Sequence, residues 1–223
     1  MTLARPLTQD QVVAAASLYR HLGWWHLTDG AIRSLRRAMP GFQPQALLLK
    51  VVAVNALYYT NVMAVTRMTE HISDILKRTR PDDFTVETVE KVACLPLIPG
   101  QKHQRRFISF ASKFAHFFID DERFPIYDYY GVKMVAHHLG KPNTGVDLEH
   151  PYAAYVDNLN RLMRESGVEA SLRQLDCYLW IVGQYAEWRR RKEAPVNTEL
   201  RRVFEKGTEQ EWELLKRVVG QDA

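Results

Sequence analysis

Apolar positions along this chain recur mostly at spacings of three and four residues, the period of a helix that buries one face. Alternating runs of β-branched residues, which indicate strands, are scarce. The pattern therefore predicts an all-α chain. The expected helices, by residue number, are 8–22, 28–35, 44–59, 62–77, 85–94, 107–118, 128–139, 152–165, 171–188 and 198–219.

The first turns of two expected helices carry capping signals. Thr8 followed by Gln11 predicts a capped helix start, and residues 23–26 are interpreted as the break after that helix. Asp128 precedes a helical pattern that stops at Gly140, which predicts Asp128 as an N-cap.

Two expected helices are apolar enough to lie in a core. Residues 44–59 are hydrophobic on most sides yet end in polar and aromatic residues. Residues 107–118 are rich in phenylalanine, and an acidic turn then leads to Asp128. The helix 85–94, by contrast, is expected to place Glu90 on its outer face.

The composition is that of an ordinary globular protein, with 46% hydrophobic and 25% charged residues. A chain of 223 residues can form one large domain or two small lobes. The formal net charge of +4 permits a polyanionic partner without requiring one.

The cysteines and the lengths of the apolar runs indicate the cellular compartment. Cys94 and Cys177 are far apart in apolar helical contexts, which favours thiols and a cytoplasmic setting. They are too few for a four-cysteine zinc site, and the adjacent His137 and His138 point to different helix faces, so no metal site is expected. No run spans a bilayer and the N-terminus lacks a signal-peptide layout, so no membrane partner is expected.

Three segments, in this order, resemble the helix-hairpin-helix DNA glycosylase superfamily. Residues 51–61 are similar to an early buried helix of that family that ends in a polar segment. Residues 124–140 are similar to its aspartate segment, a Pro-x-x-Asp turn whose helix closes in Leu-Gly. Residues 175–183 are similar to a late helix of several members, and the resemblance spans Pro44 to Trp188.

The resemblance implies a fold and an activity. The fold is a two-lobed all-α unit over residues 1–223, with the active site between the lobes. One lobe covers about residues 44–140, and residues 1–43 and 152–223 complete the other. The implied activity is hydrolysis of the N-glycosidic bond of a damaged or modified base flipped out of duplex DNA, without a cofactor. The alternatives are a DNA- or modified-base-binding protein of the same fold without catalysis, and an all-α protein–protein adaptor. The oligomeric state stays open.

The hairpin of the family, Leu-Pro-Gly-x-Gly, is altered here. The corresponding residues 98–102 end in Lys102 instead of the second glycine. Gln104 stands at the position where bifunctional members have a nucleophilic lysine. The resemblance therefore implies a monofunctional enzyme without a lyase step.

Asp128 is the candidate catalytic residue that the resemblance implies. Cleavage of an N-glycosidic bond builds positive charge on the sugar, and a fixed carboxylate stabilises that charge or positions a water. The competing interpretation is that Asp128 only caps its helix, which is the commoner role of an aspartate at this position.

Two further groups complete the expected site. The residues expected to contact the extruded base or the duplex are Tyr58, Tyr59, Thr60, Asn61, Lys113 and Tyr127. The tyrosines alternatively fill the core, and Asn61 alternatively caps the next helix. The residues expected to contact DNA phosphates are Gly100, Lys102, His103, Arg105 and Arg106. Basic residues at a helix start oppose the helix dipole, which favours a phosphate partner over a purely solvated role.

Overall fold

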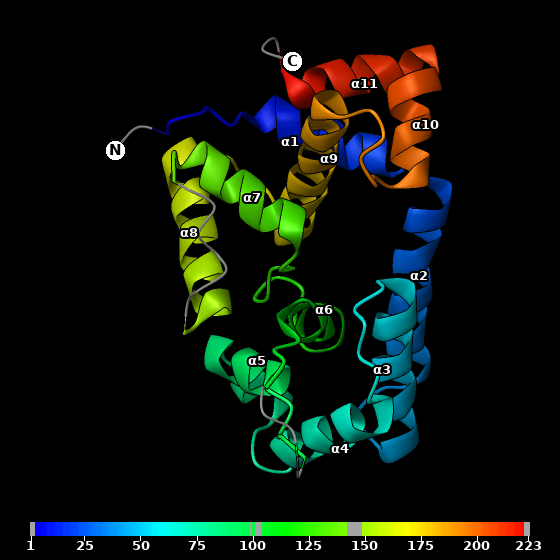
Figure 1. Ribbon diagram of the computed structural model, residues 1–223, viewed down its shortest axis with the longest axis vertical. Helices are drawn as coiled ribbons and strands as arrows, with labels where there is room; N and C mark the ends of the chain where they lie inside the picture. The colour runs from blue at the N-terminus through cyan, green and yellow to red at the C-terminus, as the bar shows by residue number, and fades with distance from the viewer. Residues whose placement is uncertain (1–2, 99, 101–103, 142–148, 221–223) are drawn as a thin grey trace. The chain divides into compact units, whose positions relative to one another are not determined.

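The computed structural model describes residues 3–98, 100, 104–141 and 149–220. Within these ranges the chain forms eleven α-helices, one 3₁₀ helix and no strand, which confirms the all-α prediction. The elements in chain order are α1 Gln9–Tyr19, α2 Gly23–Ala38, α3 Pro44–Leu57, α4 Val65–Leu76, η1 Pro81–Asp83, α5 Val86–Ala93, α6 Ile108–Phe118, α7 Tyr129–His138, α8 Pro151–Ser166, α9 Leu172–Arg190, α10 Thr198–Lys206 and α11 Glu209–Val219 (Figure 1). None of these helices combines the length and the apolar character that crossing a membrane requires.

The chain divides into two compact units. Unit 1 comprises Met1–Leu27, Asp128–Asp147 and Tyr155–Ala223, and unit 2 comprises Thr28–Tyr127 and Leu148–Ala154. Helix α7 therefore belongs with the N- and C-terminal helices, because its packing partner is α9.

The centre of unit 2 is α6, which packs against α3 and α5 (Figure 1). All its residues except Ser109 are buried, as the aromatic pattern predicts. Phe110, Phe114 and Phe118 follow one another at four-residue spacing, with ring centroids 6.1 Å and 5.5 Å apart. Aromatic side chains bury more apolar area than any others, so this row is a main source of the stability of unit 2.

Two polar side chains buried in α6 bond to the backbone of residues 124–127. The Nδ1 of His116 lies 3.0 Å from the carbonyl oxygen of Phe124. The hydroxyl of Ser112 accepts the Tyr127 N–H at 3.0 Å. The helix core therefore fixes the conformation of the segment that precedes Asp128.

A buried carboxylate fixes the same segment from another side. Glu90 accepts the N–H groups of Tyr152 and Ala153 at 2.9 Å and 3.0 Å, so it caps the start of α8. The Tyr152 hydroxyl in turn donates to the Pro125 carbonyl at 2.9 Å. The prediction that Glu90 lies on the outer face of α5 is wrong, because this residue is 9% exposed.

Unit 1 is organised around α9, which packs against α1, α7 and α10. Thr8 and Gln11 form the predicted capping box of α1, and Ser171 forms another at the start of α9. The indole of Trp180 contacts the rings of Tyr19 and Trp25, with centroids 6.1 Å and 5.3 Å apart. The Tyr19 contact packs α1 against α9, and the Trp25 contact packs the start of α2 against the same helix.

Two predicted helix boundaries are wrong, for different reasons. Residues 23–26 do not break the chain, because α2 begins at Gly23. The carboxylate of Glu199 accepts the N–H groups of Trp24 and Trp25 at 3.1 Å and 3.2 Å, and so supplies a cap from a distant helix. The single helix expected over 198–219 is interrupted at Thr208, which forms a capping box with Glu211.

Removal of the Ser112 hydroxyl is expected to destabilise unit 2. In Ser112→Ala the partly buried Tyr127 N–H loses its hydrogen bond to the Ser112 hydroxyl, which costs about 1 kcal/mol in the free energy of unfolding. Chemical denaturation measures the loss. The control is Ser34→Ala on the exposed face of α2, which is expected to change this free energy by less than about 0.5 kcal/mol. Equal stability of Ser112→Ala and the wild type would contradict the role assigned to Ser112.

Glu211 makes the stability of unit 1 pH-dependent. Its bonds from the Arg202 guanidinium, followed by the Thr208 N–H, lower the pKa of the Glu211 carboxyl from 4.5 to about 2. A lowered folded-state pKa stabilises the protein above the unfolded pKa, and this contribution is lost as the pH falls toward the folded value. Between about pH 5 and about pH 3 the wild type should therefore lose more unfolding free energy than Glu211→Gln. The comparison is made by denaturation at each pH, and parallel pH profiles would refute it.

Candidate functional site

Asp128 occupies the N-cap of α7, as the sequence predicts. Its backbone is extended, with φ −142° and ψ 172°, and its Oδ1 accepts the Gly131 N–H at 2.6 Å. Within the described part of the chain, no protein group donates a hydrogen bond to its other oxygen, Oδ2. The carboxylate is thus held by one oxygen, and the second remains available to a ligand or a water.

Gly131 lets a phenol approach the first turn of α7. A Cβ at Gly131 would lie 2.9 Å from the Tyr155 hydroxyl and 3.2 Å from Asp128 Oδ1. The first distance is shorter than a real Cβ contact and the second is tight, so a side chain here would displace Tyr155 and press on Asp128. The sequence interpretation missed Tyr155, and the glycine in the first turn was the signal for it.

Tyr130 is a second phenol near the carboxylate. Burial raises its pKa, and the negative charges of Glu187 and Asp128 raise it further. The hydroxyl therefore stays protonated at neutral pH and can donate a hydrogen bond. Its position depends on Gly183 of α9, where a Cβ would lie 2.8 Å from the Tyr130 Cβ.

Glu187 ties α7 to α9 beside these phenols. Its carboxylate accepts from the ammonium of Lys133, from Arg190 at 2.8 Å and from the Tyr129 hydroxyl at 3.3 Å. The bonds from Lys133 and then Arg190 lower the pKa of Glu187 to about 2. This ionised, nearly buried carboxylate fixes the helix that carries Asp128 at its start. Sequence reasoning did not identify Glu187, because two of its partners, Lys133 and Tyr129, lie more than 50 residues away on α7.

Unit 2 brings together three of the predicted substrate-contacting residues, Tyr58, Lys113 and Tyr127. The Lys113 ammonium donates to Ser109 Oγ at 2.8 Å and to the Tyr127 carbonyl at 3.5 Å. It also lies 5.8 Å from the ring centroid of Tyr58. The Tyr58 hydroxyl donates to the carboxylate of Asp29, a residue that the sequence interpretation missed.

The other predicted residues of this group form an unusual turn after α3. Tyr59 and Asn61 have φ values of +51° and +57°, a region that a bulky residue rarely enters. Asn55 holds this turn, since its side-chain oxygen accepts from the Thr60 hydroxyl at 3.0 Å and from the Val62 N–H at 2.8 Å. The result is an outward-facing Tyr59 side chain that is 77% exposed.

Asn61 does not cap the helix that follows. That helix, α4, begins at Val65 with Ala64 in the cap position, where no side-chain bond is made. The capping alternative for Asn61 is therefore wrong, and its side chain is exposed.

The segment between α5 and α6 carries the predicted phosphate contacts. Lys102 and His103 lie outside the described residues, as does Pro99 of the altered hairpin. Gly100 is exposed and has φ +91°, so it forms a turn that favours glycine. The Arg105 guanidinium lies 5.1 Å from the ring centroid of Phe107.

Hydrogen bonds to backbone groups join the two ends of this segment. An isolated antiparallel bridge joins Cys94 and Arg106, and Gln104 donates to the Leu95 carbonyl at 3.0 Å. The Arg106 guanidinium donates to the Glu149 carbonyl at 2.6 Å. Arg106 is thus partly engaged in holding the segment 149–154 of unit 2.

A small cavity of about 180 Å³ lies between this segment and the turn after α3. Asn61 and Met63 line it from the turn, and Leu97 and Arg105 line it from the other side. Met63 is 89% exposed and Leu97 is 49% exposed. The structure therefore places one predicted base contact and one predicted phosphate contact on the same apolar, cationic surface of unit 2.

Metal ligands are not gathered at these sites. Across the residues that the structure describes, no group of three or more His, Cys, Asp or Glu side chains has a geometry that could hold an ion.

Comparison with known proteins gives one match. A family model described as the HI_0787_N N-terminal domain matches residues 11–122. No curated protein and no solved structure matches the chain. The matched region contains the Tyr59 turn and Lys113 and ends before Asp128. The chain belongs to the HI_0787_N family.

Proposed function

We propose that this protein is a monofunctional DNA glycosylase, which hydrolyses the N-glycosidic bond of a damaged or modified base extruded from duplex DNA. The observation that carries the proposal is the Asp128 carboxylate, fixed at the start of α7 through Oδ1 while Oδ2 receives no bond from a described residue. The resemblance of residues 124–140 to the glycosylase aspartate segment supports it.

The proposed chemistry needs a preorganised negative charge. As the base departs, the sugar acquires positive charge at its anomeric carbon, and a carboxylate that is already oriented stabilises this charge without reorganising. In the proposed reaction Oδ2 faces the sugar or accepts a proton from the attacking water. The phenols of Tyr130 and Tyr155 are proposed to orient that water as hydrogen-bond donors.

A lyase step has no support among the described lysines near these residues. The Lys113 nitrogen is engaged with two oxygen acceptors, Ser109 Oγ and the Tyr127 carbonyl, which hold it within unit 2. This agrees with the glutamine at position 104 and favours hydrolysis by water.

The proposed DNA contact is the surface formed by the Tyr59 turn and the segment 95–106. Extrusion of a base leaves a gap in the stack that an aromatic side chain can fill, and the exposed Tyr59 on its left-handed turn suits this role. Arg105 beside the turn is proposed to contact a phosphate. A strained backbone at an exposed aromatic residue is more typical of binding surfaces than of structural turns.

The proposal predicts that Asp128→Asn abolishes base release. Asparagine caps a helix about as well as aspartate, so the fold should be retained while the negative charge is lost. Release of bases from duplexes that carry different damaged or modified bases, measured as abasic sites, should fall about 100-fold or more. Denaturation of the variant is the control for folding.

Two outcomes would overturn this assignment. If Asp128→Asn releases every base as fast as the wild type, the carboxylate is a cap and nothing else. If the wild type binds modified duplexes but releases no base from any of them, the protein is instead a binding protein of the same fold.

Replacement of Tyr59 separates DNA contact from stability. Tyr59→Gly relieves the positive φ, so the free energy of unfolding should stay constant or rise by up to about 1 kcal/mol. Base release should nevertheless fall about tenfold if the ring fills the gap in the stack, since stacking contributes about 1–3 kcal/mol. Unchanged base release in Tyr59→Gly would show that the ring does not contact DNA.

A further inference from the structure

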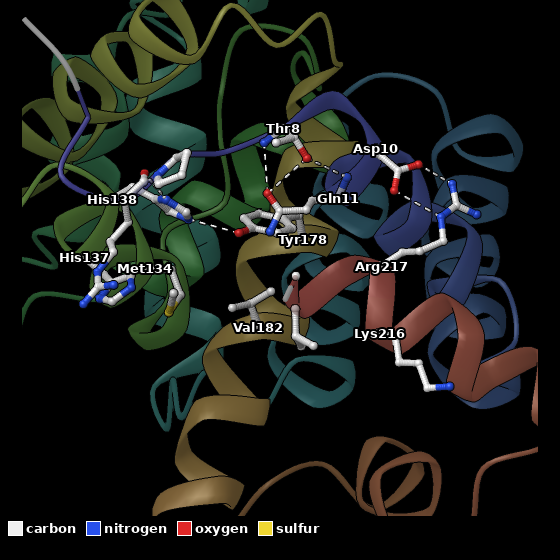
Figure 2. A pocket seen from close by; sticks show the side chains of 14 residues that line it. Thr8, Asp10, Gln11, Met134, His137, His138, Tyr178, Val182, Lys216 and Arg217 are labelled. Atoms are coloured by element: carbon white, nitrogen blue, oxygen red, sulfur yellow. Dashed lines mark hydrogen bonds and ion pairs between the residues drawn. The ribbon is translucent and has the colours of Figure 1, made fainter. Parts of the chain in front are cut away.

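A second candidate binding site lies wholly within unit 1, on the surface of α9. It is an open groove of about 920 Å³ between α7 and α11. Its lining includes the apolar side chains of Met134 and Val182 and the ring of Tyr178. Figure 2 shows these side chains between His137 on one side and Lys216 on the other. None of the residues assigned to base excision contributes to this lining.

One wall is a short segment before α1 that is clamped to α7. The N–H groups of Ala4 and Arg5 both donate to the His138 carbonyl, at 3.0 Å and 3.2 Å. The Arg5 carbonyl lies 3.0 Å from His138 Nδ1, and His138 Nε2 lies 3.1 Å from the Tyr178 hydroxyl. Because a carbonyl only accepts, Nδ1 carries the proton. In the neutral ring Nε2 then accepts from Tyr178 (Figure 2).

This clamp has a structural consequence for Arg5. Burial is the main cause that lowers the pKa of His138, so its ring is neutral at physiological pH, as the bonding pattern requires. Both backbone groups of Arg5 are engaged, which fixes its Cα at the edge of the groove. The exposed side chain of Arg5, a residue that lines the groove, therefore starts from a fixed point at the edge of the groove.

The opposite wall is the last turn of α11. Arg217 donates to both carboxylate oxygens of Asp10 on α1, with Nε 3.1 Å from Oδ2 (Figure 2). Gln11 donates to the Val218 carbonyl at 3.3 Å, which further joins the two helices. Lys216 pairs with Glu213 at 2.6 Å, but both side chains are mostly exposed, so this pair exchanges readily with a ligand.

The charge of the lining is positive on both walls. Arg5, Lys216 and Arg217 contribute cations, and among the described lining residues the only carboxylate is Asp10, which is already paired with Arg217. Partial burial and then the nearby charges of Arg5 and Lys133 lower the pKa of His137. The exposed His137 imidazole is thus a neutral, flat group in a positive field.

We propose that this groove binds a phosphate ester that carries a flat, apolar group, which is the chemistry of a nucleotide. The phosphate pairs with Arg5 and Lys216, because guanidinium and ammonium groups are the usual phosphate ligands. The flat group lies on Met134, Val182 and the imidazole of His137, as bases lie on aromatic and apolar side chains. The volume of about 920 Å³ falls within the usual range for sites that hold small organic ligands.

This site is independent of base excision, since it needs neither Asp128 nor the Tyr59 turn. The ligand chemistry has two sources, a free nucleotide and a nucleotide within a single DNA strand. The two are distinguished by titrating the full chain with adenosine 5′-monophosphate and with a short oligothymidylate, and inorganic phosphate serves as the probe of charge alone.

Binding is followed by NMR at the His137 imidazole and the Val182 methyl groups. At least one of the two nucleotide probes should shift these signals and bind more tightly than inorganic phosphate. Arg5→Glu should weaken that binding about tenfold or more, since it replaces a charge-assisted bond by repulsion. The matched control is Lys206→Glu on α10, which makes the same charge change outside the groove lining and should bind as the wild type.

A second variant tests the floor without changing charge. Val182→Trp reduces the space above α9, so it should weaken nucleotide binding while inorganic phosphate binds as before. The proposal is overturned if neither nucleotide probe shifts the groove signals, if inorganic phosphate binds as tightly as the nucleotides, or if Arg5→Glu and Lys206→Glu bind alike.

Discussion

The burial of α6 on nearly all sides is the constraint on which the conformation of residues 124–127 depends. A helix enclosed by its neighbours cannot expose Ser112, Lys113 or His116 to water, and each buried polar group left without a partner costs about 1–3 kcal/mol. All three find partners in the backbone of residues 124–127. The helix therefore specifies the conformation of an otherwise irregular segment, and that segment ends at the candidate catalytic residue.

Asp128 has one observed role, the helix cap, and one proposed role, the chemistry. A cap needs one carboxylate oxygen to accept a backbone N–H, and here Oδ1 does so for Gly131. Catalysis on a sugar needs a charged oxygen whose position is already fixed. The capping bond provides that fixation and uses only one of the two oxygens, so the cap is compatible with the proposed chemistry. The charge separates the two roles, because an amide can cap but cannot stabilise a cation.

Local features of the fold were predictable from the sequence, and features that depend on distant partners were not. Thr8 and Asp128 were recognisable as caps, because a cap and its N–H partner lie within three residues of each other. The start of α2 was missed because its cap, Glu199, comes from a helix 175 residues away. For the candidate site, Asp128 was named from the resemblance of residues 124–140, and the left-handed turn at Tyr59 was not predicted, since residues 44–59 were expected to form one helix. The phenols of Tyr130 and Tyr155 were missed, since only the packing of α7 against its neighbours brings them near the carboxylate.

The HI_0787_N family match covers the two units unequally. The matched residues 11–122 include nearly all of unit 2, with the α6 core, the Tyr59 turn and the segment before α6. Asp128, Glu187 and most of the groove lining fall outside the match and belong to unit 1. The family match therefore describes the scaffold and the proposed DNA-contacting surface. The proposed chemistry rests instead on how α7 begins and on how Glu187 attaches it to α9. Within unit 1, the bond from the Gly131 N–H to Oδ1 and the attachment of α7 to α9 through Lys133 and Glu187 therefore position this carboxylate.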